Sequence, residues 1–352
     1  MTLPAREPAP GSFIISLDFE LHWGVRDVKT VEQYRENLLG VRRAVSAMLA
    51  AFVEYDIHAT WATVGFLFFS RRNELLRALP IERPQYDDPR LSPYAEIDGI
   101  GENEGCDPYH FGHSLLEEIR TSPGQEIGTH TFSHYYCLEP KQSVVAFRAD
   151  LAAARAAGEA FGVALTSIVF PRNQYDQEHL RVCRQMGLMA FRGNLETWLY
   201  RTRRLSEERR WVRAARLADS YCDLSSHNCY VLPQAGSDLP GDLPINLPGS
   251  RFLRPYNSRV TASQALQERR IKNDLTYAAQ NGLAYHLWWH PHNFGANLGK
   301  SIETLRRILE HFRRLKECYW MRSMNMAECT LEQPPVQDHV VIEENRLARP
   351  RR

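Results

Sequence analysis

The chain has 352 residues, of which 43% are hydrophobic and 24% charged, as in an ordinary soluble globular protein. This composition excludes a mainly disordered chain, and a net charge of +1 argues against a nucleic-acid binder that relies on bulk positive charge. No apolar run approaches the about 18 residues that a membrane-spanning helix needs. The polar, proline-rich start MTLPAREPAPGS lacks the pattern of a secretory signal. We therefore expect a cytoplasmic protein with reduced cysteines, since its seven cysteines are scattered and form no CxxC pair.

Apolar runs alternate with amphipathic segments along the chain, which is typical of βα units. The predicted strands are 13–19, 59–69 (running into a helix), 126–131, 166–170, 188–191 and 284–289. The predicted helices are 31–55, 142–161, 176–186, 261–280 and 301–315. About seven such units favour an α/β fold of the distorted (β/α)7-type barrel, with a doubly wound open sheet as the alternative.

Local signals mark the ends of two of these helices. Thr30 and Gln33 have the spacing of a capping box at the start of the first predicted helix. Asp176 is a good N-cap for the third, and Gly187 stands just past its end.

Two stretches interrupt the alternation. Residues 80–113 are rich in proline, glycine and acids and are predicted to be a long inserted loop, either functional or simply solvated. Residues 199–216 carry seven arginines, which form either a solvated helix face or a rim that attracts a phosphate or an anionic lipid headgroup. We expect one barrel domain over residues 13–332, between a flexible tail at 1–12 and a C-terminal tail at 333–352.

Two acids stand at the end of the first predicted strand, in SLDFELHWG. Side chains two residues apart on a strand point to the same face, so Asp18 and Glu20 can share one site. A parallel barrel keeps its active site at this end of its strands. The alternative is a structural role, in which the acids cap the next helix.

A histidine pair and an arginine follow two other predicted strands. His130 and His134, in GTHTFSH, are four residues apart and can chelate one zinc or related ion. Arg172, in FPRN, can hold a carboxylate in a fixed orientation, although a plain surface arginine fits the same pattern.

The last predicted strand ends in HLWWHPH, where His290 or His292 could act as a general acid. Trp288 and Trp289 could wall the pocket and stack on a sugar ring, or could pack in the core. Each of these four signals is weak alone, but together they place polar chemistry at four predicted strand ends.

These motifs resemble those of the polysaccharide deacetylase family, the group that shares the chitooligosaccharide (nodulation-type) deacetylase homology domain. SLDFE is similar to the first motif of the family, GTHTFSH to the second and HLWWHP to the last. VFPRNQY resembles the third, with the order of arginine and proline changed. The likeness spans roughly residues 13–292. It implies a distorted barrel and a divalent metal, zinc above all, held by two histidines and one carboxylate.

The resemblance assigns a role to each motif residue. His130, His134 and Glu20 become the metal ligands and Asp18 the base, because Phe19 stands where the family usually has its second acid. The remaining catalytic residues would be Arg172, which orients Asp18, and His290, which protonates the departing amine, with His292 in reserve. The expected substrate-binding residues are Trp23, Tyr135, Asn173 and Trp289, and a backbone N–H near Tyr135 would stabilise the oxyanion.

The fourth motif departs from the family pattern. It usually supplies an acid that tunes the catalytic histidine, but residues 191–194 (FRGN) contain none. The partner of His290 is therefore open, with Asn194 and Asp107 as candidates.

The expected activity is metal-dependent removal of an N-acyl group, N-acetyl above all, from an amino sugar or saccharide in surface-polysaccharide or glycoconjugate metabolism. Without an export signal, a nucleotide-linked, lipid-linked or small sugar fits better than a polymer, with peripheral contact to a phosphate-bearing lipid. One alternative is hydrolysis of another non-peptide C–N bond, in a formamide or cyclic ureide. The other is an inactive carbohydrate-binding module.

Overall fold

The computed structural model describes residues 9–195, 199, 210–222, 224–233, 241–258 and 261–331. Most of the N-terminal tail predicted at 1–12, the C-terminal tail predicted at 333–352 and Arg201, Arg203, Arg204 and Arg209 of the arginine-rich segment lie outside these residues. None of the helices in the described ranges is long and apolar enough to cross a membrane. All seven cysteines are described and free, as predicted.

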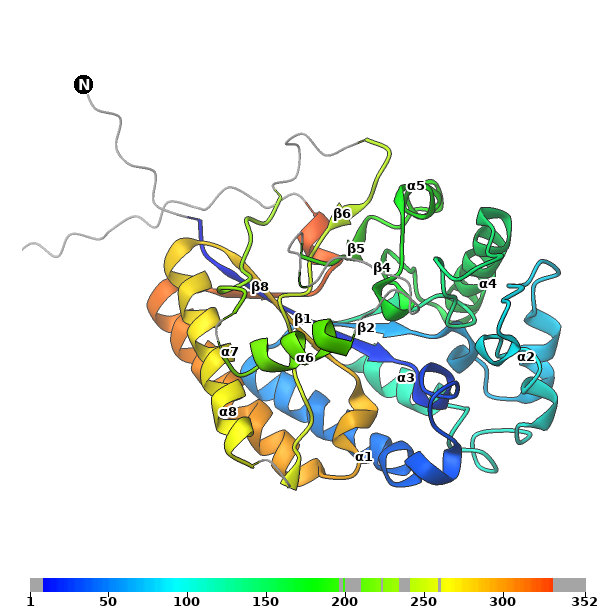
Figure 1. The fold of residues 1–352 in the computed structure, drawn as a ribbon, viewed down its shortest axis with the longest axis horizontal. Helices are drawn as coiled ribbons and strands as arrows, with labels where there is room; N and C mark the ends of the chain where they lie inside the picture. Colours follow the sequence, from blue (N-terminus) through cyan, green and yellow to red (C-terminus); the bar gives the residue numbers. More distant parts are fainter. Residues whose placement is uncertain are drawn as a thin grey trace, which may run out of the picture.

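A curled sheet of parallel strands forms the centre of the molecule (Figure 1). Its order is β6-β5-β4-β3-β2-β1-β8-β7, with β9 also pairing with β1. The strands are β1 (Ser12–Phe19), β2 (Ala59–Thr63), β3 (Gln125–Thr129), β4 (Ser167–Val169), β5 (Ala190–Arg192), β6 (Ile245–Asn246), β7 (Arg251–Phe252), β8 (Ala284–Trp289) and β9 (Arg322–Met324). Within the described ranges no pairing joins β6 to β7, so the expected distorted barrel is confirmed in an incompletely closed form.

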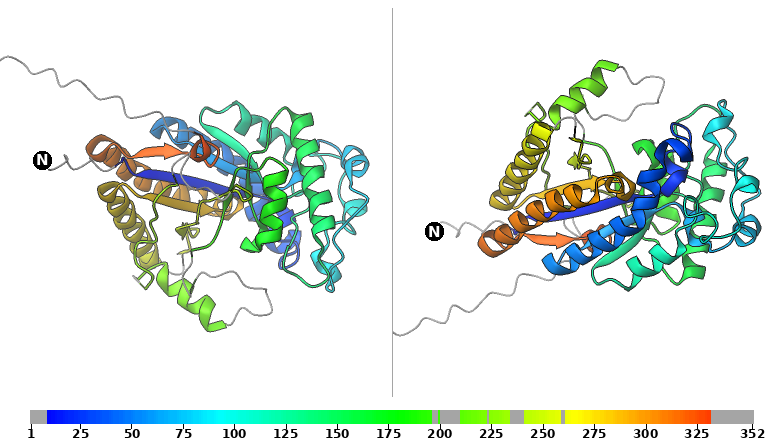
Figure 2. Two further views of the ribbon diagram at one scale, coloured as in Figure 1. Left: turned by 90° about the horizontal axis from the view of Figure 1, so that it is seen from above. Right: turned by 90° about the horizontal axis from the view of Figure 1, so that it is seen from below.

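Helices cover the outside of this sheet (Figure 2). They are α1 (Val31–Tyr55), α2 (Arg72–Ala78), α3 (His113–Thr121), α4 (Val144–Phe161), α5 (Gln177–Gln185), α6 (Arg210–Asp219), α7 (Thr261–Asn281) and α8 (Leu298–Tyr319). The predicted start of α1 is confirmed, because Thr30 and Gln33 form both hydrogen bonds of a capping box. Asp176 accepts from two backbone N–H groups at the start of α5, also as predicted.

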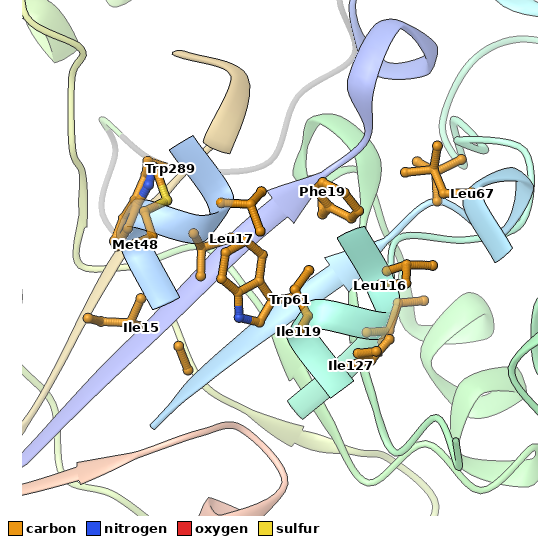
Figure 3. Close-up of a cluster of buried hydrophobic side chains, with 14 of the residues drawn as sticks. Ile15, Leu17, Phe19, Met48, Trp61, Leu67, Leu116, Ile119, Ile127 and Trp289 are labelled. Atoms are coloured by element: carbon orange, nitrogen blue, oxygen red, sulfur yellow. The ribbon is translucent and has the colours of Figure 1, made fainter. Parts of the chain in front are cut away.

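The alternation of β1 separates the core from the site. Phe13, Ile15, Leu17 and Phe19 are fully buried and pack in the main apolar cluster, some of which Figure 3 shows beside Trp61 and Trp289. Ser16 and Asp18, which alternate with these residues, point to the opposite face of the strand. Polar groups therefore collect on the inside of the barrel while the apolar face of the strand meets the helices.

The shortest strands and some helices were not predicted from the sequence. Strands β6, β7 and β9 have two or three residues each, too few for a period-two alternation. Helix α3 was also not predicted, and α8 is longer at both ends than expected. The insertion at 80–113 is a loop with two 3-10 turns, η3 (Pro89–Leu91) and η4 (Ile97–Gly99), until α3 begins.

Candidate active site

A cavity of about 210 Å³ opens where β1, β3, β4 and β8 end. It is lined by Asp18, Glu20, Gly24, His130, His134, Arg172, Asn173, Trp288 and His290. Gly24 belongs to the 3-10 turn η1 (Leu21–Gly24), where a Cβ atom would lie 1.9 Å from Cδ of Glu20. Glycine is therefore required for this turn to pass so close to the carboxylate.

Glu20, His130 and His134 meet at one point inside the cavity. Oε2 of Glu20 lies 3.3 Å from Nε2 of His130 and 3.2 Å from Nε2 of His134. One ligand atom from each of the three buried residues lies within 4.8 Å of the others. An ion bonded to such atoms at about 2.0–2.2 Å fits this spacing, and two imidazoles with one carboxylate form a donor set that suits zinc. The predicted spatial meeting of these three residues is confirmed.

Hydrogen bonds on the far side of each imidazole aim the ligand atoms. Nδ1 of His130 lies 2.8 Å from the carbonyl oxygen of Val169, to which its N–H donates. Nδ1 of His134 lies 3.1 Å from the hydroxyl of Tyr136. With Nδ1 protonated in each ring, the lone pair of Nε2 is left for a metal. Burial lowers the pKa of His134, which also favours the neutral ligand form.

The turn that carries these histidines is anchored from α4. Asp150 is fully buried and accepts hydrogen bonds from the backbone N–H groups of Phe132 and Ser133. Burial raises the pKa of Asp150 to about 7 although these hydrogen bonds oppose the shift. The backbone N–H of Tyr135 donates to Oγ1 of Thr131 at 2.7 Å, so this particular N–H is not free to bind an oxyanion. The phenol of Tyr135 bonds to the carbonyl of Ser143, away from the cavity.

Asp18 is held by an arginine that the sequence analysis did not select. Nη1 and Nη2 of Arg192 donate to Oδ1 and Oδ2 of Asp18 at 2.7 and 2.8 Å, and the arginine side chain is 1% exposed. Burial by itself raises the pKa of Asp18, but the charge of Arg192 and the hydrogen bonds hold it below its usual value. The prediction that Arg172 orients Asp18 is therefore wrong, since β5 supplies this arginine.

A buried chain of hydrogen bonds supports Arg192 from behind. Its Nη1 also donates to Oγ of Ser16, which lies 2.8 Å from Nε2 of His286. Nδ1 of His286 is 3.0 Å from the carbonyl oxygen of Leu247. The guanidinium of Arg192 lies over the Trp288 ring at 4.1 Å, and this cation–π contact covers one face of the guanidinium. Little freedom is left for Asp18 to rotate.

His290, rather than His292, faces the reacting centre. Nε2 of His290 lies 3.7 Å from Oδ2 of Asp18 and 3.6 Å from Oε1 of Glu20, and its side chain is 25% exposed. His292 is buried behind it, and burial with the nearby charge of His290 lowers the pKa of His292 to about 3. Of the two partners proposed for His290, Asp107 bonds to His110 and Asn194 donates to the carbonyl oxygen of Asn173.

Arg172 and Asn173 lie in the 3-10 turn η5 (Pro171–Asn173) and line the cavity, as expected of Asn173. The guanidinium of Arg172 bonds to Asp27 and stacks over the Tyr136 ring at 4.1 Å. Both residues have left-handed backbones, with φ of 54° and 51°. This is a strained conformation for residues with side chains.

Two tryptophans expected to bind substrate lie in the core instead. Trp289 is fully buried beside Met48 and Leu17 in the apolar cluster (Figure 3). Trp23 is buried as well, and its Nε1 donates to the carbonyl oxygen of His110. The indole that does line the cavity is that of Trp288.

The insertion supports the turn that follows Glu20. Nδ1 of His22 lies 3.0 Å from Nε2 of His110, whose Nδ1 is 2.8 Å from Asp107. Arg26 forms an ion pair with Glu96 at 2.7 Å. These contacts tie η1 and the residues after it to the loop, so the insertion is more than a solvated decoration.

The sequence held a signal for choosing Trp288 over Trp289 and another for Arg192, which was not selected. Ser16, Asp18 and Glu20 share one face, and the register pairs Ser16 with Trp288 and Leu17 with Trp289. Trp288 therefore belongs on the inner face of the barrel. An arginine inside an otherwise apolar strand such as MAFRG must pair with a buried acid, which points to Arg192.

Comparison with known proteins agrees with this geometry. The family model described as polysaccharide deacetylase matches residues 39–191, a range that includes His130, His134 and Arg172 but not the first or last motif. No curated protein matches the chain significantly.

Three solved structures are similar in fold. A protein assigned as a polysaccharide deacetylase from Mycobacterium smegmatis has 12% identity and a TM-score of 0.56, over 94% of this chain and 91% of that chain. One from Pseudomonas aeruginosa PAO1 has 10% identity and a TM-score of 0.52, over 91% and 88%. Puue allantoinase has 12% identity and a TM-score of 0.51, over 94% and 97%. The family match agrees, over residues 39–191, with the resemblance seen in the motifs, and the solved structures share the fold of the chain.

Proposed function

We propose that this protein is a metal-dependent hydrolase that removes an N-acyl group, N-acetyl above all, from an amino sugar or saccharide. The observation that carries the proposal is the meeting of Glu20, His130 and His134 beside Asp18 in one cavity. Zinc is the favoured ion because the donors are two imidazole nitrogens and one carboxylate. When bound, such an ion polarises the amide carbonyl and lowers the pKa of a water molecule.

The residues of the chain divide the remaining work. Asp18 accepts the proton of the attacking water, and Arg192 keeps its carboxylate in one orientation through two hydrogen bonds. His290 donates a proton from Nε2 to the nitrogen of the departing amine, because this atom faces both acids across the cavity. The bond that breaks is the amide C–N bond, and the products are a carboxylate and an amine.

The size of the cavity favours a small acyl group. At about 210 Å³ it lies below the 300–1,000 Å³ of typical ligand pockets, so it can enclose the reacting amide with part of one sugar ring. The rest of a saccharide would lie outside the cavity. Trp288, which lines the wall, offers an apolar surface to the acyl group or to a sugar ring.

The setting of the reaction stays a prediction. This applies to the cytoplasmic location, to a role in surface-polysaccharide or glycoconjugate metabolism and to peripheral contact with a phosphate-bearing lipid. The division into one barrel domain with two tails is likewise a proposal.

The test combines metal analysis with product release. The purified protein is stripped with a chelator, reloaded with Zn²⁺, Co²⁺ or Mn²⁺, and incubated with N-acetylated mono- and oligosaccharides and with a nucleotide-linked N-acetyl sugar. We expect one metal ion per chain and acetate release that depends on it. Lack of acetate release from every substrate by the metal-loaded protein would refute the proposal.

A cyclic ureide is a second candidate substrate, favoured by the fold shared with an allantoinase. Adding allantoin and N-formyl sugars to the same assay separates these reactions, since each gives a different product. An inactive carbohydrate-binding module would bind saccharide and release nothing. The presence of Asp18 and His290 in the cavity favours an active enzyme over that reading.

A further inference from the structure

Arg172 lines the cavity without holding the base. Both carboxylate oxygens of Asp18 already accept hydrogen bonds from Arg192. The Nη2 atom of Arg172 donates instead to Asp27, and its guanidinium stacks on Tyr136 at 4.1 Å. These two contacts fix the plane of the guanidinium in the cavity wall without involving the reacting groups.

Most N–H donors of Arg172 lack an acceptor. A guanidinium carries five N–H donors, and within the described part of the chain the bond from Nη2 to Asp27 is the one that Arg172 makes. Its Nη1 lies 3.9 Å from Oε1 of Glu139, too far for a hydrogen bond. The side chain is 22% exposed and borders the cavity. Because Nη1 is buried in the wall, a ligand that brings an oxygen to the exposed part of this side chain would meet the remaining donors on Nε and Nη2.

The backbone at this position is strained in a way that is typical of ligand-binding turns. Arg172 and Asn173 are consecutive residues with side chains, and both have left-handed φ angles of 54° and 51°. Such strain persists where the surrounding structure enforces it, and it gathers at active sites and ligand clamps. Both strained residues line the cavity.

The charges around Arg172 select the kind of oxygen it can bind. Two carboxylates, those of Asp27 and Glu139, face the one guanidinium, and their side chains are 5% and 9% exposed. These two acids offset the positive charge of Arg172, so this arginine contributes hydrogen-bond donors with little excess charge of its own. A further carboxylate or phosphate would be repelled by the two acids, whereas an uncharged oxygen would not.

We propose that Arg172 is a specificity-determining residue that donates a hydrogen bond to an uncharged oxygen of the substrate, a hydroxyl of the saccharide next to the reacting amide. This inference rests on the proposed deacetylase function and adds the substrate group that Arg172 recognises. It also separates Arg172 from Arg192, which positions the base and does not meet the saccharide.

The test measures binding apart from turnover. The Zn²⁺-loaded Asp18→Asn protein is titrated with N,N′-diacetylchitobiose, with analogues that each lack one hydroxyl, and with a phosphorylated N-acetyl sugar. The same titrations are made with Arg172→Met and Arg172→Lys added, and Arg306→Met, an exposed arginine of α8 paired with Glu54, is the matched control. In the wild-type background, acetate release gives kcat, KM and the pH profile of each variant.

We expect Arg172→Met to weaken saccharide binding and to raise KM about tenfold, with kcat within threefold and an unchanged pH profile. One deoxy analogue should bind about tenfold more weakly than the parent saccharide to the protein with Arg172 and to the control variant. Arg172→Met should bind the analogue and the parent saccharide equally. Arg172→Lys, which keeps the pairing with Asp27 and the fold, should show part of the same loss.

Three results would overturn the inference: saccharide binding unchanged in Arg172→Met, a fall in kcat at constant KM, or a preference for the phosphorylated sugar that disappears with Arg172. Absence of acetate release by the wild-type protein would refute the proposed function alone, since the binding titrations would still decide the role of Arg172.

Discussion

Two arginines at the ends of neighbouring strands have opposite surroundings. Arg192 is the last residue of β5, is 1% exposed and gives two hydrogen bonds to Asp18. Arg172 stands in the turn after β4, is 22% exposed and pairs with Asp27. Arg192 lies within its strand and reaches Asp18 from behind the cavity. Arg172 lies in a turn beyond its strand and forms part of the cavity wall. We therefore propose that the same residue type serves catalysis in one place and recognition in the other.

The largest effect is expected at the group that Arg192 holds. Asp18→Asn should lower kcat by about 10²- to 10⁴-fold because the general base is lost. Metal content should stay near one ion per chain, since Glu20, His130 and His134 are untouched. His130→Ala is the contrasting variant and should lose both metal and activity. A near-normal rate for Asp18→Asn would show that the base is assigned wrongly.

The next effect tests the arginine itself. Arg192→Met should lower kcat by roughly 10²-fold through misplacement of Asp18. It should also cost about 3–5 kcal/mol of unfolding free energy, because Asp18 would be left as a buried charge without a partner. Steady-state kinetics and urea unfolding measure the two effects, with Arg172→Met as the comparison. If both arginine variants lose kcat equally, the contrast between the two positions is false.

Adjacent tryptophans repeat the contrast between a buried and a cavity-facing side chain. Trp289→Ala should cost about 3–5 kcal/mol of stability, because a fully buried indole leaves a cavity in the apolar cluster. Trp288→Ala should raise KM, since this indole lines the cavity, and should lower kcat to a smaller extent, since the ring also packs on Arg192. Chemical denaturation and acetate-release kinetics on both variants decide the matter, and a reversed pattern would place the wrong indole at the site.

The smallest effect concerns pH. Burial and the nearby charge of His290 lower the pKa of His292 to about 3 in the folded protein, whereas in the unfolded chain it is about 6.5. As pH falls from 6.5 to 3, the unfolded state binds this proton first, so stability is lost across that window. His292→Phe should remove part of this loss, on the order of a few kcal/mol. Unfolding free energies at pH 7 and pH 4 test this, and an unchanged difference would contradict the assignment.

Periodicity and local signals were enough for the long elements. The bounds of α1 and β8 agree with the predicted ranges, because both have complete apolar patterns and α1 has a capping box. Strands of two or three residues are too short for such a pattern and were found only in three dimensions. The meeting of Glu20, His130 and His134 was predictable through the family resemblance, because two histidines four residues apart are a weak signal by themselves.

The errors at the site have one physical origin. Arg172 was selected to hold Asp18 by its place in a motif, but a salt bridge depends on which strand ends lie opposite each other. Trp289 was preferred to Trp288 although one residue decides which face of a strand a side chain takes. Trp23 is buried under a loop that is distant in sequence, through its bond to His110.

By itself, the sequence determined the barrel and its principal helices, because periodicity is a local property of the chain. Its motifs indicated the residues able to bind a metal. The tertiary structure decided which arginine meets the base, which indole borders the cavity and what the insertion supports. Those outcomes depend on the pairing of side chains more than a hundred residues apart, as between Asp18 and Arg192, and on burial that makes each such pairing obligatory.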